Sequence, residues 1–179
     1  KMALLTALRG NVIVYQGEEL GLVQDEIPYE QLQDPEAIAN WPLTLSRDGV
    51  RTPIPWEDAA QGAFTTGSPW LPMSCENLSR AVAVQEADPA SLLHFTRHLL
   101  ALRKAIPALR HGSLVDWSAD DDLLMFERDA GTARVRCLFN LSASPIDLPE
   151  PATGMIVLSV NGADHDHLPA YGALWLGTN

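Results

Sequence analysis

The feature that most constrains the fold is a change of pattern at Gly112. Turn residues divide the chain after this glycine into short runs rich in β-branched, aromatic and other apolar residues. These runs cover about residues 113–118, 123–129, 133–142, 146–150, 154–161 and 171–177. Short strands separated by turns are typical of an antiparallel β-sandwich or meander. We therefore predict a β-domain over residues 112–179.

The part of the chain before Gly112 has the pattern of an α/β fold. Apolar residues at helical spacing predict helices over about residues 1–9 and 90–104, and an apolar run predicts a buried strand at 11–15. A helix, a strand, a long loop and a second helix, in this order, are typical of a parallel α/β fold. We expect this domain to cover residues 1–111.

The segment between the strand and the second helix, residues 16–88, is unusually long for a loop. Loops beyond about 15 residues are uncommon and are usually functional or disordered. This one is rich in proline and contains Trp41, Trp56 and Trp70, which favours a packed and rigid excursion. Because active sites of parallel α/β folds form from loops that follow strand ends, we expect it to line a pocket. Aromatic rings, carboxylates and a few arginines suit a sugar as the ligand.

Composition restricts the class of partner. The net charge is −11 at pH 7, which argues against nucleic acid because phosphate binding needs a basic surface. No apolar run approaches the ~20 residues needed to span a bilayer, so no membrane partner is expected. Cys75 and Cys137 lie far apart and match no metal or redox spacing. We therefore expect two reduced, buried cysteines in a cytoplasmic protein.

The histidine and aspartate clusters give no convincing metal site. His94 and His98 are one helical turn apart but have no third ligand in view. The run 120–122 lacks the alternating ligands and the glycine of a calcium loop. The cluster at 165–167 is expected in a polar loop between strands. We expect no metal and no cofactor.

Several motifs, taken in order, carry a resemblance to a known family. They are GNVIVYQGEELGL, LQDPEAI, SRDGVRTPIPW, GAFTTGSPWLP and QEADPASLLHFTRHLLALRKAIPAL. This series resembles the C-terminal part of glycoside hydrolase family 13, the α-amylase superfamily. It is most similar to the bacterial α-glucosidase and oligo-1,6-glucosidase branch. The resemblance is specific from the start of the chain to about Gly112, and beyond it the match is mainly one of pattern.

The resemblance implies the fold of this family, a TIM (β/α)8 barrel followed by an antiparallel β-sandwich domain. Residues 1–9 would be the end of barrel helix seven and residues 11–15 would be strand eight. Residues 16–88 would be the loop after that strand, and 90–104 would be helix eight. The strand would then end in acidic residues because its end lies at the mouth of the barrel.

The resemblance also implies an activity, the retaining hydrolysis of terminal α-linked glucose from maltose- or isomaltose-type oligosaccharides, with transfer of glucose in some members. In this family the two catalytic aspartates and the catalytic glutamate follow strands four, five and seven. They would lie upstream of Lys1, so we expect no catalytic residue in this segment and no activity from it alone. Its partners would be the oligosaccharide and the missing N-terminal barrel portion of the same chain. Adjacent Glu18 and Glu19 point in different directions and cannot flank one glycosidic bond.

Two residues are the candidates for substrate binding. The resemblance implies that Arg47 binds the glucose at the non-reducing end and that Glu36 lies near the leaving-group sugar. A guanidinium can donate two parallel hydrogen bonds to hydroxyls or to a carboxylate. The alternatives are a surface arginine held by Asp48 and a helix-start carboxylate after Asp34-Pro35.

The other candidates are expected to support the pocket rather than to touch sugar: Tyr15, Gln16, Glu18, Glu19, Asp48 and Arg51. Arg51 would brace the loop by salt bridges to Glu18 or Asp48. Glu18 and Glu19 would accept hydrogen bonds that hold the loop, and Tyr15 and Gln16 would lie in the barrel core or at the pocket floor. The loop tryptophans are expected to pack inside the loop.

Two other interpretations stay open. The first keeps the family but changes the reaction to that of a sucrose isomerase, a trehalose synthase or a trehalose-phosphate hydrolase. The second is a non-catalytic carbohydrate-binding module that reuses the family's terminal part. A module would fold stably and bind sugar by itself, whereas a segment of a barrel would expose strand edges and apolar helix faces.

Overall fold

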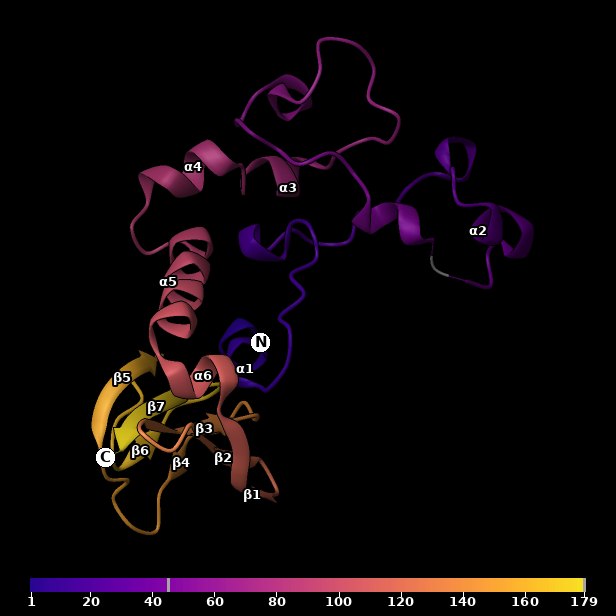
Figure 1. Cartoon of the computed structure of the whole chain (residues 1–179). Helices are drawn as coiled ribbons and strands as arrows, with labels where there is room; N and C mark the ends of the chain where they lie inside the picture. The colour runs from indigo at the N-terminus through magenta and orange to yellow at the C-terminus, as the bar shows by residue number, and fades with distance from the viewer. Residues whose placement is uncertain (45, 179) are drawn as a thin grey trace. The chain divides into compact units, whose positions relative to one another are not determined.

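The computed structural model of the chain describes residues 1–44 and 46–178 (Figure 1). Its internal contacts divide the chain into two units. One unit contains Lys1–Val12 together with the chain from His98 onward, and the other contains Ile13–Arg97. The longest helix, α5 (Leu92–Ala105), contributes residues to both.

An antiparallel sheet of five strands organises the first unit. In spatial order its strands are β1 (Ser113–Asp120), β2 (Leu123–Asp129), β3 (Arg134–Asn140), β7 (Ala173–Thr178) and β5 (Met155–Val160). The first three form a meander, and a second sheet pairs β4 (Ile146–Asp147) with β6 (His167–Leu168). The antiparallel strands predicted after Gly112 are therefore confirmed. The short strand β6 was predicted as loop.

Both faces of the five-stranded sheet contribute to the core. Leu138 and Leu174 lie opposite each other on β3 and β7 and belong to a buried apolar cluster with Leu168. On the other face, Cys137 and Trp175 are paired and fully buried. This double burial explains the nearly continuous apolar runs in β3 and β7, where a sheet with one wet face would alternate.

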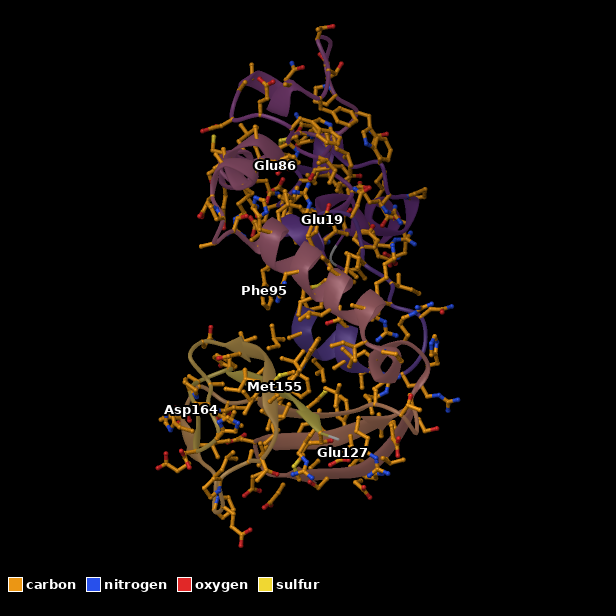
Figure 2. All side chains as sticks on the ribbon, turned by 60° about the vertical axis from the view of Figure 1, so that its left-hand side comes forward. Glu19, Glu86, Phe95, Glu127, Met155 and Asp164 are labelled. Atoms are coloured by element: carbon orange, nitrogen blue, oxygen red, sulfur yellow. The ribbon has the colours of Figure 1, made fainter. Side chains whose placement is uncertain are left out.

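A cross-strand ion pair lies on the same sheet. Glu127 of β2 (Figure 2) is opposite Arg136 of β3 and accepts hydrogen bonds from its Nε at 2.8 Å and its Nη2 at 2.6 Å. Opposite charges at directly facing positions support one register of two antiparallel strands.

Two arginines bind the C-terminal end of α1 (Met2–Ala7). Arg103 of α5 donates to the carbonyl oxygens of Thr6, Leu8 and Gly10 at 2.6, 2.9 and 2.5 Å. Buried Arg128 of β2 donates to the carbonyl of Ala7 at 2.6 Å. The last carbonyls of a helix have no partner within the helix, so cationic donors are favourable there.

Short helices replace the long loop predicted at 16–88. They are the α-helices α2 (Pro35–Asn40), α3 (Cys75–Leu78) and α4 (Val82–Ala87) and the 3-10 helices at Glu18–Leu20, Tyr29–Gln31, Arg47–Val50 and Ala60–Ala63. A small core of Ile27, Leu32, Ala37 and Leu71 holds part of this segment together. The Asn77 side chain bonds both the N–H and the carbonyl of Val23 at 2.9 and 3.0 Å. The expectation of a packed excursion fits this arrangement.

Other expectations need correction. The two predicted helices correspond to α1 and α5, while α6 (Pro107–His111) was not predicted. Residues 11–15 form no strand with any described residue. A strand needs neighbouring strands for its backbone hydrogen bonds, and the described chain offers none at this place. Cys137 is buried as expected, whereas Cys75 is exposed at the start of α3. Both cysteines are free.

Candidate functional site

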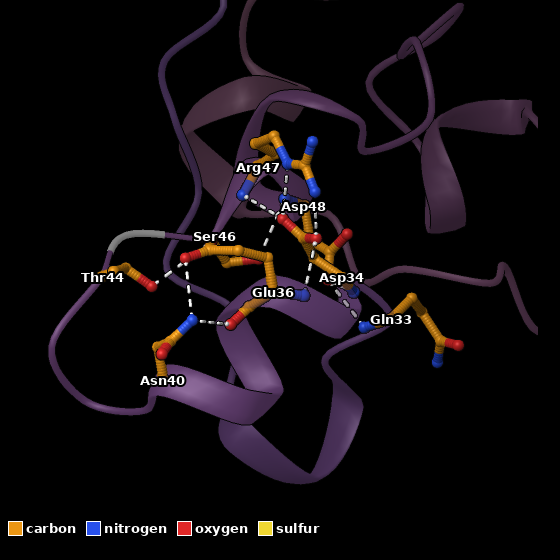
Figure 3. A network of polar contacts seen from close by, with 8 residues as sticks. All are labelled: Gln33, Asp34, Glu36, Asn40, Thr44, Ser46, Arg47 and Asp48. Carbon is orange, nitrogen blue, oxygen red and sulfur yellow. Dashed lines mark hydrogen bonds and ion pairs between the residues drawn. The ribbon is translucent and has the colours of Figure 1, made fainter.

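The centre of the candidate site is an ion pair between Arg47 and Asp34 (Figure 3). Arg47 donates from Nε to Asp34 Oδ2 at 2.8 Å and from Nη2 to Oδ1 at 2.5 Å. Its backbone N–H also donates to Oδ2, at 3.2 Å. The Asp34 side chain has no exposed surface, whereas 58% of the Arg47 side chain is exposed. A buried carboxylate therefore holds a cation that faces outward.

Asp34 has a second function, because it caps α2. Its Oδ1 accepts the N–H of Glu36 at 3.3 Å, and Pro35 occupies the first helical position, as is common at helix starts. The hydrogen bond from Arg47, above all, holds the pKa of the Asp34 carboxyl well below its usual range. Asp34 is therefore ionised at neutral pH.

Asp48 supports this pair from within the loop. Its side chain is fully buried, and Oδ2 accepts the N–H groups of Gln33 at 2.6 Å and Asp34 at 2.8 Å. Its own N–H donates to Ser46 Oγ at 3.0 Å, which caps the 3-10 helix Arg47–Val50. Asp48 therefore binds the backbone that carries Asp34 and does not bind Arg47.

Glu36 lies on α2 next to the ion pair. Its carboxylate accepts from Asn40 Nδ2 at 3.1 Å and Thr44 Oγ1 at 3.4 Å, both neutral donors (Figure 3). The side chain is exposed and stands beside Arg47 closely enough to raise the arginine pKa, after the larger effect of Asp34. The two predicted substrate-binding residues are thus brought into one network.

A cavity of about 620 Å³ adjoins the network. Residues 24–29, Trp41, Pro42, Thr44 and Ser46 line it. The rings of Tyr29 and Trp41 lie 5.7 Å apart at 48° to each other, and both are about half exposed. An apolar ring surface beside carboxylate, amide and hydroxyl groups is the combination that sugar sites use.

The predicted supporting residues are only partly brought together. Glu18 Oε2 accepts the N–H of Tyr15 at 3.1 Å, a bond of the kind expected to hold the loop. Tyr15 and Gln16 are exposed, while Glu19 (Figure 2) is half-buried in the 3-10 helix Glu18–Leu20. Their role as pocket support stays a prediction.

Arg51 differs from expectation. In the described part of the chain it forms no salt bridge to Glu18 or Asp48, and its N–H donates to the Asp48 carbonyl at 2.8 Å. Backbone N–H groups occupy only Oδ2 of Asp48, and Oδ1 is buried without a hydrogen-bond partner among the described residues, so neither oxygen pairs with Arg51. The three loop tryptophans are also about half exposed rather than packed inside the loop.

Sequence reasoning missed the function of Asp34. The available signal was its position before Pro35, because an Asp-Pro pair is a common helix start and marks Asp34 as a cap. Nothing in the sequence shows that the cap also binds an arginine 13 residues later.

The described residues contain no group of three or more His, Cys, Asp or Glu placed to hold a metal ion. Among the described helices, none is long and apolar enough to cross a membrane.

The chain belongs to the alpha-amylase family, because the family model "Alpha amylase, catalytic domain" matches residues 1–112. One curated relative, the probable alpha-glucosidase of Rhizobium meliloti (strain 1021), is 48% identical over 180 residues, which cover 97% of this chain and 32% of that protein. The oligo-1,6-glucosidase of Parageobacillus thermoglucosidasius is 27% identical over 158 residues, or 77% of this chain and 28% of that protein.

Solved structures agree with this assignment. The alpha-glucosyl transfer enzyme XgtA superposes with a TM-score of 0.88 at 40% identity, over 99% of this chain and 34% of that one. The isomaltulose synthase of Erwinia rhapontici NX5 superposes with a TM-score of 0.86 over 99% of this chain and 37% of that one. Its 23% identity shows a common fold only. The expected family and fold class are confirmed, and the chain spans about a third of the length of these relatives.

Proposed function

We propose that the chain is the C-terminal segment of a retaining, exo-acting α-glucosidase. Such an enzyme removes terminal α-linked glucose from short oligosaccharides of the maltose or isomaltose type. The observation that carries the proposal is the 48% identity to a probable alpha-glucosidase along almost the whole chain. The Arg47 site and the adjoining cavity support it, because they offer hydrogen-bond donors and ring surface to a sugar.

In this proposal the catalytic carboxylates belong to the part of the relatives' length that the chain does not span. One of them attacks the anomeric carbon and a second, about 5 Å away, protonates the leaving oxygen. Residues 1–111 complete the TIM barrel, and residues 112–179 form the β-sandwich domain. Strand eight at 11–15 then takes its neighbours from the rest of the barrel, which accounts for its lack of partners here.

The residues of this chain bind and orient the substrate. Arg47 donates hydrogen bonds to the terminal glucose and closes the pocket behind it, so that only chain ends are accepted. Glu36 lies toward the leaving-group sugar. Holding the sugar in one orientation lowers the entropic part of the barrier.

A second candidate is glucosyl transfer to an acceptor other than water. The specific observation that favours it is the 40% identity to the alpha-glucosyl transfer enzyme XgtA. Both reactions pass through the same kind of glucosyl-enzyme and differ only in what attacks it. The isomerase reaction is supported by a common fold alone.

The test uses the complete protein, purified and assayed on maltose and isomaltose. Hydrolysis with release of α-glucose, followed by NMR, is expected, and transfer would appear as longer products at high maltose concentration. Arg47→Ala should lower kcat/KM by roughly 100-fold or more, because the site would leave sugar hydroxyls unpaired. Arg97→Ala is the matched control, since Arg97 is also an exposed arginine in a two-bond carboxylate pair, with Glu86. Equal activity of the two variants would contradict the role of Arg47.

A further inference from the structure

We propose that Asp34 is a positioning residue. It fixes the orientation of the Arg47 guanidinium, so that one edge of this group donates hydrogen bonds to a pair of neutral hydroxyls. This inference rests on the proposed function, because it assumes that Arg47 meets the sugar. It adds a residue, a binding geometry and a ligand class to that function.

A guanidinium has five N–H donors in a rigid plane. Asp34 occupies the Nε–H and one N–H of Nη2 of Arg47. The donors that remain are the two on Nη1 and the second on Nη2, which lie on the edge away from Asp34. A ligand can therefore meet Arg47 through parallel donors on Nη1 and Nη2, and two acceptor oxygens on neighbouring carbons match them.

The position of this edge is set by Asp34, which is itself held by burial and by hydrogen bonds. Asp34 is fully buried, its N–H donates to Asp48 Oδ2, and its carboxylate also caps α2. The backbone N–H of Arg47 bonds the same carboxylate that its side chain bonds. The long arginine side chain therefore loses its freedom before the ligand arrives, which lowers the entropic cost of binding.

The charges around Arg47 select the class of ligand. The Arg47–Asp34 pair is neutral as a whole, and the carboxylates of Glu36 and Asp48 both act on Arg47 as well. An anionic ligand would be attracted by Arg47 but repelled by the carboxylates of Asp34, Glu36 and Asp48. The arrangement therefore favours vicinal hydroxyls over a carboxylate or a phosphate, which are the ligands that an unpaired arginine binds best.

The experiment is a double-mutant cycle in the complete protein, with kcat and KM measured on maltose. Asp34→Asn removes the charge but keeps the helix cap, because asparagine caps as well as aspartate. With Arg47 present, this change is expected to raise KM about 10-fold or more, with a smaller effect on kcat. In the Arg47→Ala background the same change is expected to alter kcat/KM less than about 2-fold.

A second readout tests the ligand class. D-glucose and D-glucuronate are compared as competitive inhibitors of the wild type and of Asp34→Asn. Removing the aspartate leaves Arg47 with an uncompensated charge, so the inhibition constant of glucuronate relative to that of glucose is expected to fall about 10-fold. A merely structural function of Asp34 would not change this ratio.

Glu86→Gln is the matched control, because it removes the carboxylate partner of Arg97 in an equivalent pair elsewhere. It should leave both readouts unchanged. If Asp34→Asn does not fold, Asp34→Ser retains a capping side chain and replaces it in the cycle.

The outcomes separate the two proposals. If Arg47→Ala lowers kcat/KM while Asp34→Asn is silent, the positioning inference is wrong and the proposed function stands. Equal losses from Asp34→Asn in both backgrounds, or an unchanged inhibitor ratio, would also overturn the inference. An Arg47→Ala variant with full activity would overturn both.

Discussion

Gly49 is the residue of the SRDGVRTPIPW motif that packing constrains most directly. Its carbonyl accepts the N–H of Asp25 at 3.0 Å, and a Cβ at this position would overlap the carbonyl of Asp25. Gly49→Ala should therefore destabilise the complete protein by about 1–3 kcal/mol, measured by urea unfolding, because the backbone must shift. Gly67→Ala is the control, since its Cβ would make only an ordinary contact, 3.8 Å from Thr65 Oγ1. Equal stability of the two variants would contradict this account.

Protonation of Asp34 gives a second prediction for a single residue. Its pKa is lowered in the folded protein, chiefly by the hydrogen bond from Arg47, while the unfolded chain has the ordinary value of 3.8. The ionised form therefore stabilises the fold above about pH 4, and this stabilisation is lost as the pH falls through the lowered folded value. The stability difference between wild type and Asp34→Asn should be constant from pH 5 to 8 and shrink below pH 4. A difference that persists unchanged to pH 2 would contradict the pairing.

Sequence reasoning reached Arg47, Glu36 and Asp48 as members of one site, and the structure places them in one network. The alternative for Arg47, a surface arginine held by Asp48, is wrong, because the carboxylate that pairs with Arg47 is Asp34. Which carboxylate meets an arginine depends on how the chain returns after α2, and this return depends on buried contacts such as Asp48 with the N–H groups of Gln33 and Asp34. Such contacts leave no periodic trace in the sequence.

At the scale of elements, the helices and strands with strong periodicity were predictable. The runs that became β1, β2, β3, β5 and β7 lie between turn residues and agree with the observed strands. The short helices of residues 16–88 were not predictable, because helices of three to six residues are held by caps and distant contacts rather than by propensity. Gln85 is an example, since its side chain bonds the carbonyl of Leu20, 65 residues away.

Arg128 connects β2 to the ends of α1 and α6, and its replacement gives a prediction at this scale. It is fully buried on β2 and donates to the carbonyls of Ala7 at 2.6 Å and Gly112 at 2.8 Å, and burial lowers its pKa. Arg128→Ala removes two charge-assisted bonds and leaves both carbonyls unpaired, so we expect a loss of about 2–4 kcal/mol in the free energy of unfolding. Arg134→Ala, which breaks an exposed pair with Asp129, should cost at most about 1 kcal/mol. Similar losses from the two variants would show that Arg128 is not a tie between elements.

At the scale of the whole molecule, exposed apolar side chains distinguish a segment from a self-contained module. Ile13 is 82% exposed and Leu43 is 87% exposed, and Trp56, Trp70 and Met155 are also exposed. Isolated exposed apolar residues are ordinary, but this number of large ones in one chain suits a surface that the rest of a protein covers. A carbohydrate-binding module that functions by itself would keep few of them.

The 179-residue chain produced alone should therefore bind a hydrophobic dye, associate in size-exclusion chromatography and release no glucose from maltose. If the proposed function holds, the complete protein should show the opposite in all three assays, because the remaining barrel would cover these side chains and would supply the catalytic carboxylates. Calorimetry with maltose provides the decisive comparison. Suppose that the 179-residue chain is a monomer with a sharp unfolding transition, and that maltose raises the temperature of this transition. A folded state of the chain would then bind the sugar by itself. That result would favour the binding module and contradict the α-glucosidase segment.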